Sequence, residues 1–300
     1  MESGHTVGMT NSTTTDASQF VLATEATLGV TRIAVRELER SIPFYTDVIG
    51  LDHLATDGSV ARLGSGGSTV LELSQEPDAP KAGQHAGLYH VALLYPSRIE
   101  LARVVARIAH QGVAIQGAAD HGTHEAIYLA DPDGNGLELA ADRPRDQWPS
   151  PQEEYTVGPQ PLNTPDLMQL IDGEDVVKRA GAGVTIGHLH LHVGSIDDAL
   201  AFYCETLGFE LRAQLSTAAF VSLGGYHHHL GMNIWKGSGA PPAPEGVLGL
   251  RFWTLQIPAA DIAILAARLE DCAAAHERDG QAIIVRDPWN NELRIEPLAG

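Results

Sequence analysis

The chain repeats its own sequence, and this internal repeat limits its possible folds more than any other feature does. Residues 30–51 and 188–209 align without a gap, so that Tyr45 matches Tyr203 at the same offset as the residues around it. Two later segments also repeat, GLYH at 87–90 as GLRF at 249–252, and DPDGNGLEL at 131–139 as DPWNNELRI at 287–295. Such repeats indicate copies of one supersecondary unit. The four copies span 28–75, 87–143, 185–236 and 248–298.

Each copy shows the same order of patterns. A short alternating strand such as HLHLHV comes first, an amphipathic helix follows, and further strands are then broken by glycine-rich turns. The sequence therefore predicts an α+β fold of four βαβββ modules, paired into two cup-like half-barrels.

The same patterns divide the chain into segments. We expect a disordered tail over 1–25, an N-terminal domain with modules one and two over 26–143, and a C-terminal domain with modules three and four over 184–300. The Pro-rich, acidic stretch 144–183 is predicted to be a linker or covering loop, with one candidate helix at 165–171.

Composition excludes several classes of partner. The formal net charge of −19 argues against nucleic acid and against an anionic membrane surface. The sequence has no apolar run long enough to span a bilayer, and residues 1–19 lack the basic start and apolar stretch expected of a signal peptide. Its two cysteines are too few for a disulfide framework. These features predict a cytoplasmic protein that acts on a small molecule, and they leave a homo-oligomer open.

One candidate metal site emerges from the repeat. His90 and His188 occupy equivalent places on the opening strands of modules two and three, and Glu138 follows the DPDGNG turn on a closing strand. Two histidines and one carboxylate on one face of a metal suit iron(II) and leave positions open for reactants. Outside the middle modules, the equivalent positions hold Val30, Phe252 and Arg294, none of which is a metal ligand. The sequence therefore predicts a single site, formed only if modules two and three meet.

Further candidates surround this set. The run His227, His228 and His229 lies between apolar segments and is interpreted as a buried strand, although a surface histidine run is the simpler alternative. Alternation would point either His228 alone, or both His227 and His229, into the site. Module two adds His121, His124 and Tyr128. Apolar or polar contacts to a substrate are expected from Phe220, Asn233 and Trp235. Trp253 is a further candidate, and core packing explains the aromatic residues equally well.

The segments GLYHVALLYPSR, YLADPDGNGLELAADRPRDQW, IGHLHLHV and GGYHHHLGMNIW together resemble the vicinal oxygen chelate superfamily. This superfamily includes glyoxalase I, bleomycin resistance proteins and type I extradiol dioxygenases, and the likeness is to the four-module catechol-2,3-dioxygenase branch. The resemblance implies a metal cup formed by two modules, with His188 from one and His90 and Glu138 from the other. Familiar extradiol enzymes place their ligands in modules three and four, so this chain departs from them. If modules one and two paired instead, the set would be Glu72, His90 and Glu138.

The resemblance also implies roles. It implies iron(II) as cofactor, with Mn(II), Zn(II) or Ni(II) as alternatives, O2 as co-substrate and a catechol-type aromatic diol as substrate. His228 matches the acid–base histidine, Tyr128 the tyrosine ten residues before the ligand glutamate, and His121 loosely matches a further histidine. Two other functions stay open. One is a glyoxalase-like isomerase or lyase that uses Glu72 as a second carboxylate, and the other is a binding protein that sequesters an aromatic drug in a metal-free cup.

Overall fold

A computed structural model describes residues 21–22, 25–176 and 179–298, so most of the predicted tail over 1–25 lies outside the described residues. Within the described part, the strands form two eight-stranded sheets. The first sheet runs in the order β14 (His276–Asp279), β15 (Ala282–Arg286), β16 (Glu292–Pro297), β13 (Gly249–Ile257), β1 (Thr27–Val35), β4 (Ser68–Gln75), β3 (Val60–Ser65) and β2 (Asp52–Asp57). The second runs in the order β10 (Glu210–Gln214), β11 (Ala218–Ser222), β12 (Leu230–Asn233), β9 (Thr185–His192), β5 (Gly87–Leu94), β8 (Gly136–Asp142), β7 (His124–Ala130) and β6 (Gly117–Asp120).

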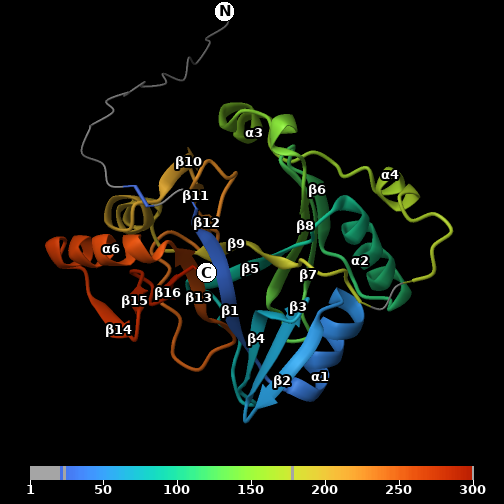
Figure 1. Cartoon of the computed structure of the whole chain (residues 1–300), viewed down its shortest axis with the longest axis horizontal. Helices are drawn as coiled ribbons and strands as arrows, with labels where there is room; N and C mark the ends of the chain where they lie inside the picture. The colour runs from blue at the N-terminus through green and yellow to red at the C-terminus, as the bar shows by residue number, and fades with distance from the viewer. Residues whose placement is uncertain (1–20, 23–24, 177–178, 299–300) are drawn as a thin grey trace, which may run out of the picture.

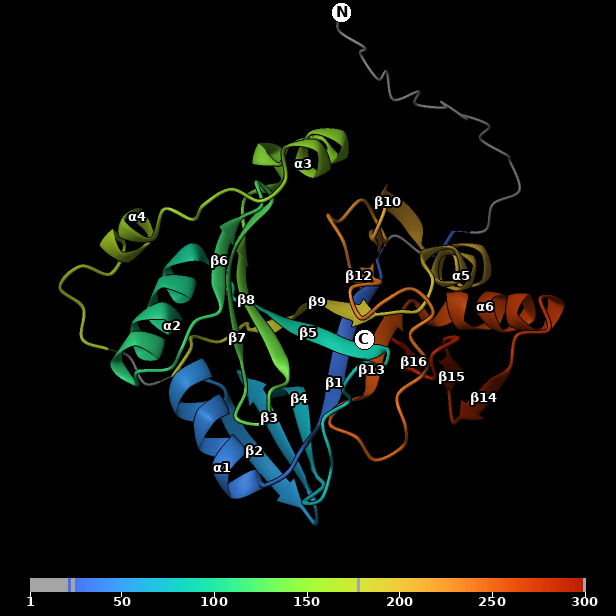
Figure 2. The same cartoon turned by 180° about the vertical axis from the view of Figure 1, so that it is seen from behind.

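These orders confirm the predicted α+β fold of four βαβββ modules in two curled sheets. Modules one and four share the first sheet, joined by the antiparallel pair β1 and β13, while modules two and three share the second, joined by β5 and β9. Figures 1 and 2 show β6 to β8 and β10 to β12 rising on either side of β5 and β9, so that the second sheet forms a cup. Each sheet therefore combines one module that precedes the linker with one that follows it. The domain limits 26–143 and 184–300 stay predictions.

Helices cover the outer faces of the sheets. In α2 (Arg98–His110) and α6 (Ala259–Asp271), the buried residues recur at helical spacing, as the amphipathic patterns predict. Ser97 caps α2 by accepting a hydrogen bond from the Glu100 N–H. Modules one and three carry shorter helices that continue into wider turns, α1 (Leu38–Pro43) with η1 (Phe44–Ile49) and α5 (Ile196–Leu200) with η3 (Ala201–Thr206). No helix in the described ranges is long and apolar enough to cross a membrane.

The linker holds more helix than the sequence predicts. The candidate helix at 165–171 is observed as α4 (Thr164–Gln169), whose Asp166 binds Arg98 of α2 at 2.8 Å. The helices η2 (Arg145–Gln147) and α3 (Pro151–Val157) were not predicted. The signal for α3 is local, because Ser150 and Glu153 form a reciprocal capping box and Pro151 occupies the first turn.

A repeated tyrosine ties consecutive modules together although they lie in different sheets. Tyr45 donates a hydrogen bond to the Asp131 carboxylate at 3.1 Å, and Tyr203 donates to Asp287 at the same distance. Each aspartate also accepts backbone N–H groups of its own turn, for example from Asn135 at 2.8 Å. The matching DPDGN and DPWNN motifs are therefore structural joints outside the candidate metal set.

We predict that Tyr45→Phe and Tyr203→Phe each lower the free energy of unfolding by about 2 kcal/mol, since each leaves a buried carboxylate short of one partner. Denaturant titration followed by circular dichroism measures this. Tyr89→Phe is the control, because Tyr89 is 38% exposed. Loss of stability in the control equal to that in the two variants would contradict the prediction.

Candidate metal centre

Three adjacent strands at the floor of the cup carry the predicted ligands. His90 lies on β5, Glu138 on β8 and His188 on β9, and both Glu138 and His188 pair in register with Ala92 of β5. Side chains two apart on a strand share a face, so Ala92 points the same way as His90. The register therefore directs all three side chains into the cup.

The ligand atoms converge as a metal would require. His90 Nε2 and His188 Nε2 each lie 3.1 Å from Glu138 Oε2, and the two nitrogens are 3.4 Å apart. Neighbouring donors on an octahedral metal with bonds of about 2.1 Å lie about 3 Å apart. All three residues are buried, with exposed fractions of 6%, 1% and 2% for His90, Glu138 and His188. The residues present thus fit a divalent transition metal by donor type, spacing and seclusion.

Electrostatics keep the Glu138 carboxylate charged. Burial alone raises its pKa, but electrostatic interaction with His188 and hydrogen bonds with His124, His188 and His90 bring the pKa well below its usual value. In His188, burial outweighs the nearby carboxylate and lowers the pKa of the imidazole. An ionised carboxylate beside a neutral imidazole is the protonation state that a metal ligand set needs.

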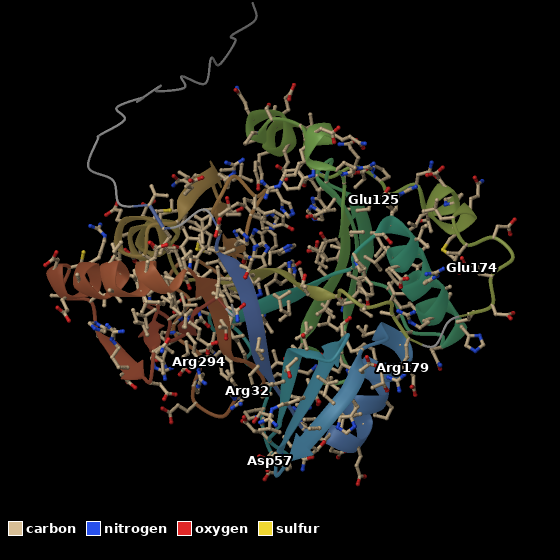
Figure 3. All side chains as sticks on the ribbon, viewed as in Figure 1. Arg32, Asp57, Glu125, Glu174, Arg179 and Arg294 are labelled. Atoms are coloured by element: carbon tan, nitrogen blue, oxygen red, sulfur yellow. The ribbon has the colours of Figure 1, made fainter. Side chains whose placement is uncertain are left out.

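The equivalent cup in the first sheet is filled by ion pairs. Glu72 on β4 is bound by Arg32 at 2.6 Å and by Arg62 at 3.3 Å. The Arg32 and Arg294 guanidinium carbons lie 4.8 Å and 3.8 Å from the centre of the Phe252 ring, and both arginines are labelled in Figure 3. The alternative set of Glu72, His90 and Glu138 is therefore not assembled, because Glu72 belongs to the other sheet.

The histidine run is buried as predicted, but it is not a strand. Strand β11 ends at Ser222 and β12 begins at Leu230, with Gly224 and Gly225 turning the chain at φ of 58° and 68°. Alternation of side chains consequently does not apply, and the three imidazoles point in different directions.

Among the three histidines of the run, only His228 lies against both the predicted ligand His188 and the Phe220 ring. Its ring centre is 4.3 Å from that of His188 and 5.1 Å from that of Phe220. The neighbouring His227 places Nε2 3.3 Å from Asp142, and His229 accepts a hydrogen bond from the Leu223 N–H. Both side chains therefore already have partners within the protein.

Tyr128 and His121 reach the cup as a hydrogen-bonded pair. Tyr128 lies opposite Glu138 in the β7–β8 register, and its hydroxyl oxygen lies 2.7 Å from His121 Nε2. Burial, helped by nearby His124, lowers the pKa of His121 to about 4, so this imidazole is neutral near pH 7.

His124 is a functional candidate for which the sequence analysis predicts no role. Its Nε2 donates to Glu138 Oε1 at 3.1 Å, on the carboxylate oxygen turned away from His90 and His188. Its ring is stacked between those of His121 and His227, at 4.5 Å and 4.6 Å. Burial alone lowers the pKa of His124, but the hydrogen bond to Glu138 and surrounding carboxylates raise it. Alternation of side chains along a strand could have indicated His124, because its side chain lies on the same face of β7 as that of Tyr128.

The four remaining predicted contact residues lie in four different places. Phe220 lies on the wall beside His228, and Trp235 is 54% exposed at the rim, with its ring 5.6 Å from that of His190. Asn233 has a different position from the one expected, because its amide is held between His190 and His192 at 2.9 Å and 2.7 Å. Trp253 does not line this cup, since it lies on β13 of the first sheet and is fully buried in the core.

The linker covers one end of the cup. Tyr155 of α3 packs its ring 4.8 Å from Phe220 and donates to the His227 carbonyl at 3.4 Å. Glu154 accepts the Thr123 hydroxyl at 3.2 Å, and Thr123 Oγ1 lies 2.9 Å from His124 Nδ1. Residues of α3 are therefore connected to the candidate ligand Glu138 through two side chains.

Comparison with known proteins agrees with this architecture. A family model described as the Glyoxalase/Bleomycin resistance protein/Dioxygenase superfamily matches residues 27–139 and 185–295. Catechol-2,3-dioxygenase from Bacillus subtilis (strain 168) is 38% identical over 268 residues, covering 87% of this chain and 93% of that protein.

Two solved structures share the fold. Glyoxalase I from Zea mays has a TM-score of 0.56 at 17% identity, covering 90% of this chain and 92% of its own. The cppA protein from Streptococcus pneumoniae TIGR4 has a TM-score of 0.56 at 13% identity, covering 94% and 99%. With the family model matching most of the chain, this protein belongs to the glyoxalase/bleomycin resistance protein/dioxygenase superfamily.

Proposed function

We propose that this protein is an extradiol ring-cleaving dioxygenase that holds iron(II) through His90, Glu138 and His188. The observation that carries the proposal is the convergence of two imidazoles and one carboxylate, all buried, on one face of the cup. This donor set leaves open positions for two reactants. The name of the Bacillus subtilis relative supports a catechol as the substrate.

Bound iron would supply the chemistry that joins an aromatic diol to dioxygen. The protein's own residues position the substrate and move its protons. His228 Nδ1 lies 2.9 Å from His227 Nδ1, which leaves His228 Nε2 to exchange a proton with a substrate hydroxyl. The Tyr128 hydroxyl, oriented by His121, holds a substrate oxygen. Phe220 and Tyr155 keep water from the end of the cup that α3 covers.

An assay on protein that is loaded with iron anaerobically and then given O2 tests the activity directly. Protein loaded with ferrous iron should turn catechol and O2 into a yellow ring-cleavage product, whereas His188→Ala and Glu138→Gln should bind iron at least about 100-fold more weakly and form no product. His110→Ala, an exposed change at the end of α2, is the control. The absence of product from several catechols with iron-loaded protein would overturn the proposal.

A second prediction concerns His124. Its hydrogen bond fixes the carboxylate of Glu138, and loss of such a partner typically weakens metal binding 10–100-fold. We expect this loss in His124→Ala, measured by anaerobic titration with Co(II) or Fe(II). His124→Gln should recover part of the affinity, because its amide N–H can donate to the same oxygen. Equal affinity in His124→Ala and the unaltered protein would show that Glu138 needs no such support.

A further inference from the structure

A cavity of about 850 Å³ opens beside the candidate metal centre. His90 and Tyr128 line its inner end, and the segments 81–90 and 243–251 form much of its wall. Cavities of this size hold ligands much larger than one aromatic ring. A catechol at the metal would therefore leave most of the space free for a substituent.

The cavity is positively charged in a protein whose net charge is −19. The sequence contains three lysines, Lys81, Lys178 and Lys236, and two of them, Lys81 and Lys236, line this cavity. Among the described residues, neither of these two ammonium groups forms an ion pair.

The other charged groups of the wall are mostly neutralised within the protein. Arg251 binds Glu76 at 2.6 Å, and Arg286 pairs with Glu292. Asp133 is bound by two arginines of module one. Glu245 is the remaining carboxylate of the wall, and it is exposed, as Lys81 is, whereas Lys236 is half-buried. The two lysines thus leave a local excess of positive charge.

Aromatic rings line the path from the metal centre toward Lys236. The Tyr89 ring lies 4.9 Å from His90, 5.0 Å from His192 and 5.3 Å from Trp235. Burial and the nearby charge of Lys236 lower the pKa of His192, which places Lys236 beside this wall. A substrate ring held near His90 could therefore extend a side chain along Tyr89 toward Lys236, with Lys81 elsewhere in the wall of the same cavity.

We propose that the substrate is a catechol whose short side chain ends in a carboxylate, bound by Lys81 and Lys236. This inference rests on the proposed function, since it places the diol at His90, Glu138 and His188. Positive groups with no partner in a concave site attract an anion and raise its local concentration. They also offset the repulsion that a strongly acidic protein exerts on an anionic substrate.

The test compares acid and neutral substrates of the same iron-loaded enzyme. The acids are 3,4-dihydroxyphenylacetate and 3-(2,3-dihydroxyphenyl)propionate, and the neutral partners are 4-methylcatechol and 3-propylcatechol. We expect kcat/KM to favour at least one acid over its partner about 10-fold, mainly through KM. Lys236→Met and Lys81→Met should reduce this ratio about 10-fold together, while Lys236→Arg should retain it. Arg278→Met, an exposed change on β14, is the matched control for loss of one positive charge.

Each outcome decides the inference separately from the proposed function. Cleavage of both substrate classes with equal kcat/KM, or a ratio that the lysine variants leave unchanged, would overturn the anionic side chain and leave the dioxygenase intact. If neither class is cleaved, anaerobic calorimetry with the same compounds replaces kinetics. Tighter binding of the acid that depends on Lys81 and Lys236 would then support the site although the proposed reaction fails, and equal binding would overturn it.

Discussion

The antiparallel pairing of β5 with β9 is the interaction on which the candidate site depends. This ladder places His90 opposite His190 and Ala92 opposite His188, so residues almost one hundred positions apart share one cup floor. Because side chains alternate along a strand, a slip of one residue would turn His188 out of the cup. The parallel pairing of β5 with β8 then sets Glu138 beside the same Ala92. Two strand registers are thus sufficient to assemble the three donors.

The buried Glu138 carboxylate at the floor of the cup needs hydrogen-bond partners. Glu138 is almost fully buried, and an isolated carboxylate there would be very costly. Three imidazoles contact it, two on one oxygen and His124 on the other. His124 is in turn connected through Thr123 to Glu154 of α3. The linker helix therefore covers the cup and also completes the polar network beneath it.

Much of this architecture could be predicted from the sequence, because the repeat encodes it. The modules follow from patterns that recur, and the three ligands follow from equivalent positions whose residue types differ between modules. Contacts that depend on three-dimensional detail do not follow from the repeat. A turn at Gly224 and Gly225 stands where a strand was expected. Side chains from His227 to His229 therefore do not alternate between two faces. Asn233 faces two histidines because β12 pairs in parallel with β9, a register that no local pattern reveals.

The contrast between the two cups explains why the predicted ligand set of His90, Glu138 and His188 is assembled in the second sheet rather than the first. Both cups have the same strand order, so backbone geometry alone does not distinguish them. In the first sheet, Arg32 takes the place that His190 has in the second, and Glu72 takes that of Gly231, as the strand registers show. The glycine leaves room for the His190 ring, whose Nδ1 lies 2.9 Å from a Cβ built at position 231. In the first cup, Glu72 instead forms ion pairs with Arg32 and Arg62, so this carboxylate already has two cationic partners. Differences in side chains, rather than in the shared strand order, therefore place the candidate metal ligands in modules two and three.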